Sequence, residues 1–371
     1  MLCTVNLYAV QFILGRISTL KLNRRRSAGF QYLPMENLIP VYQHPTLTVL
    51  VDDSKSFLDS LAFQLNPHFA RQTFHDPQAA LDWFQHAHWH STQKINEPIH
   101  VGYDERTDCF ERRSASIDLE RIYGVVLDRK RFDIPSVLVI DYAMPQMNGV
   151  EFCQAIQKLP CKKILLTGHA DEKIAIDAFN RNLINCFIQK NDPGAMDRLK
   201  TEIVRLQKDF FHEQTSTLND LLSRHSYSFL IDPAIGVLVE QLSKRYRFVE
   251  YYLFPNPDGI LFFDMQGKAT LLVLQTKSSL GTQYEIALDQ GAPIELLTAL
   301  QELRLVPFFY ESGGVYLEMI GEDWLSYCLP PQICHGKEDY YWALFDLPSR
   351  YLSEPVYSYA KYLLDHAAKP R

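Results

Sequence analysis

The sequence predicts an α/β fold in two parts: a parallel sheet of five strands wound by helices on both faces, then a C-terminal α+β domain. Two observations carry this prediction. Short apolar runs alternate with amphipathic stretches between residues 47 and 213, which is typical of repeated strand–helix units. From residue 226 onward the chain is rich in Tyr and Phe, and apolar runs follow one another with fewer helical stretches. The 371 residues suffice for two or three domains.

The first part contains five strands and five helices in alternation. The expected strands are 47–52, 70–74, 137–141, 162–167 and 185–189. The expected helices are 54–66, 77–88, 148–158, 170–181 and a long one that begins at 194. Helices in these positions return the chain to the start of each next strand, which a parallel sheet requires.

Polar side chains follow four of these strands where each strand ends. Asp52 and Asp53 follow the first strand, Asp141 ends the third, Thr167 ends the fourth and Lys190 follows the fifth. The carboxyl ends of parallel strands meet at one edge of the sheet, where ligands bind in open α/β folds. Three carboxylates, a hydroxyl and an ammonium at that edge suit a divalent cation and a phosphoryl group.

This order of residues resembles the receiver domain of two-component response regulators. That family has an acidic pair after the first strand and Asp-x-x-Met-Pro-x-Met-x-Gly after the third. A Thr or Ser follows the fourth strand, and a Lys follows the fifth with an aromatic residue three positions before it. The matching residues are Asp52, Asp53, Asp141, Met144, Pro145, Gly149, Thr167, Phe187 and Lys190. The resemblance implies a flavodoxin-like sheet with strand order 2-1-3-4-5.

The resemblance makes Asp141 the phospho-acceptor, a carboxylate nucleophile that forms an acyl phosphate. It makes Asp53 and Asp141 direct ligands of Mg²⁺, with the backbone carbonyl of Ala143 as a third ligand and Asp52 acting mostly through water. A cation is expected on physical grounds too, because three converging carboxylates repel one another and a small hard cation relieves that repulsion.

Three further residues receive roles from the resemblance. Lys190 places a positive charge against the phosphoryl oxygens. Thr167 donates its hydroxyl to the phosphoryl group, and Phe187 turns inward behind it, so that the two form a two-state switch. A second interpretation of the acidic pair is helix capping, because residues 52–54 precede an amphipathic stretch. Capping and metal binding are compatible.

Two departures from the family pattern stand out. Lys190 is followed by Asn191 and not by the usual Pro, which predicts a different local loop. Asp53 and Asp141 lie 88 positions apart, about twice the usual separation, so a segment of about 87–135 is inserted before the third strand. Within it we expect an apolar helix at 116–129 that packs on the receiver or on a partner subunit.

The insertion begins with His86, His88 and His90, which could bind a metal. On a helix, however, residues two apart point to different faces, which favours ordinary surface histidines.

The fifth helix carries a 3-4-3-4 apolar spacing, the seam of about two coiled-coil heptads, at Met196, Leu199, Ile203, Leu206 and Phe210. One interpretation is a connecting helix that reports the receiver state to the next domain. The other is a helix packed on its own sheet, a role that we expect for the first of these residues.

The C-terminal part has the pattern of a meander with a few helices. Its expected strands are 248–254, 259–264, 269–275, 305–310, 314–319 and 340–346, and its expected helices are 233–245, 292–303 and 354–366. The expected organisation is an N-terminal extension at 1–44, a receiver at 45–213, a helical linker at 214–225 and an output domain at 226–371.

The termini and cysteines limit the class of protein. Seven cysteines without a CxxC pair indicate reduced thiols in a cytoplasmic protein. No apolar stretch reaches the ~18–20 residues of a spanning helix. Residues 1–41 hold five Lys or Arg and one acid, a net +4. That segment is an amphipathic arm that docks on a partner or a membrane surface, or a weakly ordered extension, or part of an over-long reading frame whose true start is Met35.

The output domain matches no common effector class. From residue 223 to 371 there are 12 Lys or Arg and 18 Asp or Glu, a net of −6, which disfavours nucleic acid as a partner. No helix-turn-helix, cyclase, phosphodiesterase or Walker signature is present. We therefore expect no enzyme, but a module that binds a downstream protein or a ligand.

The layout as a whole resembles bacterial quorum-sensing response regulators with an N-terminal extension, an enlarged receiver and an atypical output domain. That resemblance implies phosphorylation by membrane sensor histidine kinases and a phosphorylation-dependent homodimer. Two alternatives remain open. One is a phosphorylation-controlled transcription factor whose DNA-binding fold is unfamiliar. The other is a receiver that gates a nucleotide-binding or enzymatic output domain.

Overall fold

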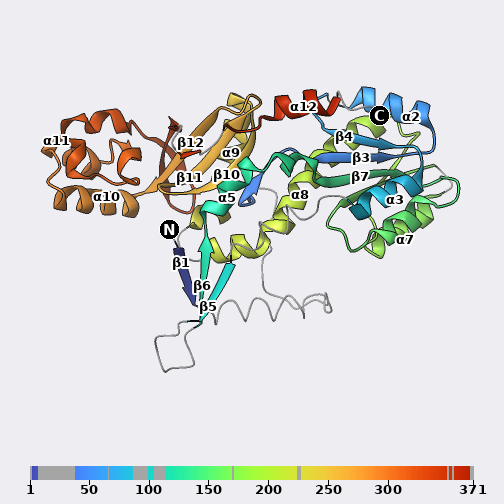
Figure 1. The fold of residues 1–371 in the computed structure, drawn as a ribbon, viewed down its shortest axis with the longest axis horizontal. Helices are drawn as coiled ribbons and strands as arrows, with labels where there is room; N and C mark the ends of the chain where they lie inside the picture. Colours follow the sequence, from blue (N-terminus) through green and yellow to red (C-terminus); the bar gives the residue numbers. More distant parts are fainter. Residues whose placement is uncertain are drawn as a thin grey trace. The chain divides into compact units, whose positions relative to one another are not determined.

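The computed structural model describes residues 2–6, 38–65, 67–86, 99–103, 113–168, 171–223, 227–348, 351–352 and 355–367. The chain forms two compact units (Figure 1). The parallel-sheet unit comprises residues 43–93, 128–214 and 359–371, and the antiparallel-sheet unit comprises 1–42, 94–127 and 215–358. Each unit is therefore assembled from three separate stretches of sequence.

The parallel-sheet unit has the predicted fold. Its sheet runs β4-β3-β7-β8-β9 with every neighbouring pair parallel, which is the order 2-1-3-4-5. The strands are β3 (Leu47–Val51), β4 (Arg71–Phe74), β7 (Pro135–Asp141), β8 (Lys162–Thr167) and β9 (Cys186–Gln189). Every residue of β3, β7 and β8 is buried, because helices cover both faces of a central parallel strand.

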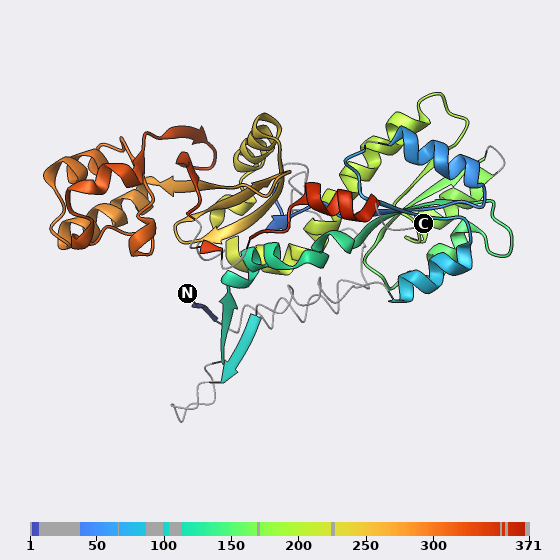
Figure 2. The ribbon, with the colours of Figure 1, turned by 45° about the horizontal axis from the view of Figure 1, so that its top comes forward.

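Helices pack on both faces of this sheet (Figure 2). One core contains side chains from α3 (Pro77–His86), α6 (Gly149–Ala155) and α7 (Glu172–Asn180). The other contains side chains from α2 (Lys55–Gln64) and α8 (Ala195–Ser223). All five predicted helices are present. His86 ends α3, and His88 and His90 lie outside the described residues.

The first half of α8 packs on its own sheet. Leu199, Ile203 and Leu206 are buried in the same core as the strand residues of β7 and β8. These three residues of the predicted apolar seam therefore pack inside the unit. The helix then continues without a break to Ser223.

The last helix of the chain, α12 (Tyr359–Ala367), also belongs to the parallel-sheet unit. The Tyr359 hydroxyl accepts a hydrogen bond from the Ala70 amide at 3.0 Å and donates one to the His68 carbonyl at 2.6 Å. The Tyr362 hydroxyl donates to a carboxylate oxygen of Asp133 at 2.9 Å. We expected a helix at 354–366 as part of the output domain. It begins later, and its tyrosines bind the parallel-sheet unit because they find backbone and carboxylate partners there.

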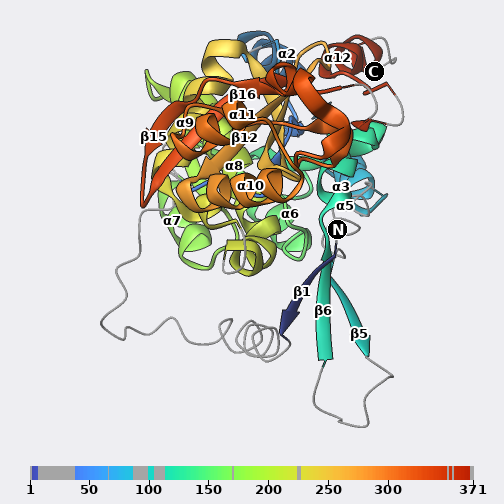
Figure 3. The ribbon, with the colours of Figure 1, turned by 90° about the vertical axis from the view of Figure 1, so that its left-hand side faces the viewer.

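The antiparallel-sheet unit is built on a six-stranded sheet of order β15-β16-β12-β11-β10-β2. The strands are β2 (Tyr42–Gln43), β10 (Phe248–Pro255), β11 (Asp258–Asp264), β12 (Ala269–Thr276), β15 (Gln332–His335) and β16 (Asp339–Asp346). The helices are α9 (Pro233–Tyr246), α10 (Lys277–Asp289) and α11 (Ile294–Gln301), seen in Figure 3. The α+β prediction is confirmed.

Several predicted elements of this unit are wrong. The strand expected at 305–310 is reduced to β13 (Val306–Pro307), which pairs with β14 (Cys328–Leu329). The strand expected at 314–319 is absent, because Gly313 and Gly314 adopt φ of 72° and 95° in a turn and a 3-10 helix, η7 (Glu318–Tyr327), follows. Helix α10 was not expected, since it buries only Leu280 and Ala287 fully and so has a weak apolar period.

The helix expected at 116–129 is also wrong in its first half. Residues 113–118 form β6 (Arg113–Asp118), which pairs with β1 (Leu2–Asn6) and β5 (Ile99–Tyr103). Helix α5 (Glu120–Gly124) follows. It packs on β10 of the antiparallel-sheet unit, where the Tyr123 and Phe254 rings lie 5.3 Å apart.

No helix in the described ranges is both long and apolar enough to cross a membrane. The cysteines found free in those ranges are Cys153, Cys161, Cys186, Cys328 and Cys334.

Asp258, at the start of β11, gives the antiparallel-sheet unit a predictable pH dependence. Burial raises the pKa of its carboxyl to about 7, against about 3.9 for an ordinary Asp. Its ionisation therefore opposes folding increasingly as the pH rises from about 4 to about 7. We expect Asp258→Asn to raise the free energy of unfolding at pH 8 by on the order of 2 kcal/mol, allowing for partial exposure, and to change it little at pH 4. Denaturant titrations at the two pH values test this; an equal effect at both would contradict it.

Candidate functional site

The three predicted carboxylates meet at one edge of the parallel sheet. Asp52 and Asp53 follow β3, and Asp141 ends the neighbouring strand β7. One carboxylate oxygen from each lies within 4.8 Å of those from the other two. Asp52 and Asp141 are buried and Asp53 is exposed, so the cluster opens to solvent on the Asp53 side.

Lys190 connects two of these acids. Its Nζ lies 2.7 Å from Oδ2 of Asp52 and 3.0 Å from Oδ1 of Asp141. The backbone amide of Lys190 donates to the carbonyl of Thr167 at 2.9 Å, which anchors the end of β9 beside β8. The ammonium also lies 4.2 Å from the centre of the Phe57 ring. Sequence reasoning missed Phe57, because nothing in the spacing of α2 indicates a cation–π contact with a residue so distant in the chain.

The loop after Lys190 replaces the usual proline with an Asp-based turn. The Asp192 amide donates to the Gln189 carbonyl at 3.2 Å. Oδ1 of Asp192 accepts from the Gly194 amide at 3.1 Å, just before α8 begins. The departure from the family pattern is thus confined to a short turn, and Lys190 still reaches the carboxylates.

Thr167 is buried at the end of β8, and its Oγ1 has no hydrogen-bond partner. A buried hydroxyl without a partner is costly and uncommon. An acceptor that arrived beside it would remove that cost. Phe187 lies three positions before Lys190, on β9, and is partly buried against the core beneath α3, α6 and α7.

The loop after β7 holds Asp141 in place. A Cβ atom at Gly149 would overlap the carbonyl oxygen of Asp141, so only glycine fits this position. The Gly149 amide donates to the Tyr142 carbonyl at 3.0 Å, and Asn148 caps α6 with its side chain. The backbone amide of Ala143 donates to the Asp141 carboxylate.

The surroundings of Asp141 oppose its ionisation. Burial raises the pKa of Asp141, and the negative charge of Asp52 raises it further. The hydrogen bond and charge of Lys190 and the Ala143 amide act in the opposite direction without cancelling the effect. When all groups are ionised, three carboxylates face one ammonium, a net charge of −2. This donor set fits a divalent cation that prefers oxygen ligands and retains water, as Mg²⁺ does.

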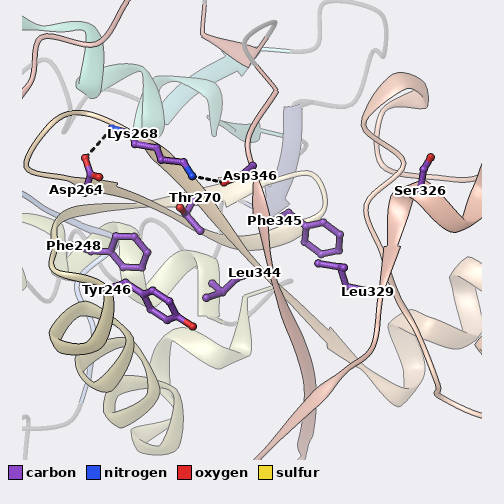
Figure 4. Close-up of a pocket in the computed structure, with 10 residues that line it drawn as sticks. All are labelled: Tyr246, Phe248, Asp264, Lys268, Thr270, Ser326, Leu329, Leu344, Phe345 and Asp346. Atoms are coloured by element: carbon purple, nitrogen blue, oxygen red, sulfur yellow. Dashed lines mark hydrogen bonds and ion pairs between the residues drawn. The ribbon is translucent and has the colours of Figure 1, made fainter.

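The antiparallel-sheet unit contains a separate cavity of about 500 Å³ at one end of its sheet (Figure 4). Lys268 binds Asp346 across it, with Nζ 2.9 Å from the carboxylate oxygen. Asp264 accepts from the backbone amides of Gln266 and Lys268 at 2.8 and 2.9 Å. These charges thus bond within the β11–β12 turn and to β16, and Tyr246, Thr270 and Ser326 add hydroxyl groups to the cavity lining.

Comparison with known proteins places the chain. Residues 114–203 match the model of the response regulator receiver domain. No curated protein matches. The solved structure of the Legionella pneumophila response regulator LqsR is similar with a TM-score of 0.71 and 31% sequence identity, covering 88% of this chain and 96% of that chain.

Two other solved structures are more distant. An adenylate cyclase from Rhodopirellula baltica has a TM-score of 0.31 at 22% identity, covering 48% of this chain and 97% of that chain. A response regulator receiver domain protein from Clostridium thermocellum has a TM-score of 0.29 at 17% identity, covering 44% of this chain and 95% of that chain. Neither bears on function. The similarity to LqsR extends over nearly the whole of both chains, and with the 2-1-3-4-5 parallel sheet it shows that this chain belongs to the response regulator family.

Proposed function

We propose that this response regulator accepts a phosphoryl group on Asp141 from a sensor histidine kinase. The observation that carries the proposal is the convergence of Asp52, Asp53 and Asp141 on one point while the Lys190 ammonium touches two of them. Acidic side chains that only capped helices would not require a cation from another strand between them.

In the proposed transfer, a carboxylate oxygen of Asp141 attacks the phosphorus of a phosphohistidine. A phosphorus–oxygen bond forms, the phosphorus–nitrogen bond breaks, and the electron pair stays with the imidazole nitrogen of the kinase. Lys190 faces the incoming phosphoryl oxygens and balances part of their charge. Asp141 must be ionised to attack, so its raised pKa makes the reaction slower at low pH.

The site would hold Mg²⁺ through the side chains of Asp53 and Asp141 and the carbonyl of Ala143, with Asp52 acting through water. When bound, the cation would neutralise the converging negative charges of the carboxylates and the phosphoryl group. Gly149 and the Asn148 cap fix the loop that carries Ala143, and so hold its backbone close to the Asp141 carboxylate.

We further propose that Thr167 and Phe187 form the switch. A phosphoryl group adds about −1.5 to −2 charges and strong acceptor oxygens. The buried Thr167 hydroxyl, which has no partner in the resting state, would donate to them. Phe187 would then turn inward, and the altered surface would promote a homodimer.

We also propose domain boundaries at 44, 213 and 225, a cytoplasmic location and a role in quorum sensing. The output domain would act through a downstream protein or ligand rather than through catalysis or nucleic acid. The net charge of −6 in residues 223–371 supports the last point.

Light scattering tests the switch. Beryllofluoride with Mg²⁺ mimics an acyl phosphate without a kinase. We expect the wild-type particle mass to double, and the masses of Asp141→Asn and Thr167→Ala to stay unchanged. The matched control Thr201→Ala, on the exposed side of α8, should behave like the wild type. If fluorine NMR shows beryllofluoride bound to wild type while its mass stays constant, the dimer proposal fails.

Cation binding should depend on pH in a definite direction. Because Asp141 holds its proton more tightly than an ordinary Asp, a divalent cation must displace that proton at low pH. We expect Mg²⁺ affinity to rise with pH and to level off once Asp141 is fully ionised. Below that point it should change by about tenfold per pH unit for one displaced proton. Calorimetry in two buffers of different ionisation enthalpy counts the protons.

A variant of one proposed metal-binding residue gives a second test of Mg²⁺ binding. Asp53→Asn should weaken Mg²⁺ by at least about tenfold, since it removes an exposed carboxylate ligand while leaving the buried part of the site intact. Asp197→Asn removes the same charge from a solvated position on α8 and should leave the affinity unchanged. Affinity independent of both pH and Asp53 would refute Mg²⁺ binding by this cluster.

A further inference from the structure

A groove of about 370 Å³ lies in the helical part of the antiparallel-sheet unit, between α11 and η7. Its rim carries Ile294 and Leu325, which are 70% and 63% exposed. Trp324 and Leu305 also line it. Two large aliphatic side chains thus face water at one groove, where the apolar side chains of a partner could cover them.

The floor of the groove is independent of these rim residues. The core behind it is formed by buried side chains from α10, α11 and η7, among them Leu296, Leu300 and Tyr327. Ile294 and Leu325 are not part of that core. The core therefore does not depend on these two side chains, and both are free to contact a partner.

The segment that carries the groove is strongly acidic. Residues 277–327 contain eight Asp or Glu and two Lys or Arg, a net of −6. The remainder of 223–371 holds ten acids and ten bases, so the whole excess of this part of the chain lies in the groove segment. Of its two bases, Arg304 lines the groove and forms an ion pair with Glu302 at 2.6 Å. Glu295, Glu322 and Asp323 are exposed on the groove's own elements.

We propose that this groove docks a basic amphipathic helix of a partner protein. The helix would place apolar side chains between Ile294 and Leu325, and its Lys or Arg residues against the surrounding acids. A second copy of this chain fits less well. A symmetric contact through the same patch would place two segments of net charge −6 against each other. The same charge disfavours nucleic acid at this face.

This inference goes beyond phosphoryl transfer and does not depend on it, so the test uses the unphosphorylated full chain. The probe is a fluorescent 18-residue model peptide with Leu on one helical face and Lys on the other. Two control peptides have Glu in place of Lys, or the same Leu and Lys residues in scrambled order. Fluorescence anisotropy at low and high salt gives the affinities.

Two double variants separate the apolar and the electrostatic contributions to peptide binding. Ile294→Gln with Leu325→Gln should weaken the Leu–Lys peptide by about tenfold or more at every salt concentration. Glu322→Gln with Asp323→Asn should weaken it mainly at low salt and flatten the salt dependence. The control is Leu364→Gln on α12. Leu364 is also highly exposed, at 73%, and its substitution should leave the peptide affinity unchanged. Circular dichroism verifies the fold of each variant.

Three results would overturn the proposal. The first is a peptide affinity that neither double variant changes. The second is equal binding of the Glu or scrambled peptide, which would mean nonspecific apolar adsorption. The third is a wild-type dimer that the Ile294→Gln and Leu325→Gln variant loses, because the groove would then be occupied by a second copy.

Discussion

Asp141→Asn should abolish phosphorylation of the chain. Asn has the size of Asp but no carboxylate to attack phosphorus, so no acyl phosphate can form. The fold should survive, because burial already disfavours the charge that is removed. Incubation with acetyl phosphate and Mg²⁺, followed by intact mass spectrometry, should show one added phosphoryl group on the wild type and none on the variant. The wild-type adduct should be cleaved by hydroxylamine, as acyl phosphates are.

Two controls separate the acceptor from its surroundings. Asp53→Asn keeps the nucleophile but loses a proposed cation ligand, so it should accept the phosphoryl group slowly rather than never. Asp177→Asn removes a carboxylate from an exposed ion pair on α7 and should match the wild type. Stoichiometric phosphorylation of Asp141→Asn that is stable to hydroxylamine would show that another residue is the acceptor, and would contradict the proposal.

The second large effect concerns α12. Tyr359→Ala should lower the free energy of unfolding of the parallel-sheet unit by about 3–5 kcal/mol, as for other large buried aromatic residues. The ring is buried against Phe132, with 5.1 Å between ring centres, and the hydroxyl bonds the backbone on both sides of Phe69. Without it, the amide of buried Ala70 loses its partner.

Hydrogen exchange measured by mass spectrometry locates this effect. Peptides that cover residues 67–74 should exchange much faster in Tyr359→Ala, and thermal unfolding should begin at a lower temperature. Tyr359→Phe keeps the ring and should lose only about 1–2 kcal/mol. Leu364→Ala, on the exposed face of the same helix, should stay within ±0.5 kcal/mol of the wild type. Unchanged exchange in Tyr359→Ala would mean that α12 does not stabilise this unit.

The parallel sheet was predictable because its signals are local. Strands β3, β7 and β8 are buried throughout, so each contains an apolar run in the sequence, at 49–51, 137–140 and 164–166. The candidate site was predictable for a related reason. Its residues follow those runs directly, and parallel topology alone carries them to one edge of the sheet.

The elements that were not predicted depend on distant partners. Residues 113–118 form a strand because β1 and β5 pair with it on either side. Helix α10 has no strong apolar period, and Tyr359 and His366 of α12 gain partners that lie almost 300 positions away. Such choices are made by tertiary contacts that override local preference, and a single sequence does not display them. Phe57 beneath Lys190 belongs to the same class.

The three-segment composition of the parallel-sheet unit has a consequence during synthesis. Its last segment, 359–371, leaves the ribosome only after the whole antiparallel-sheet unit has been made. Domains usually fold as the nascent chain emerges, N-terminal part first. Here the unit that carries Asp141 must wait for residues 359–371 to obtain its closing helix. Copies from which these residues are missing would thus carry Asp141 in an incomplete and less stable unit.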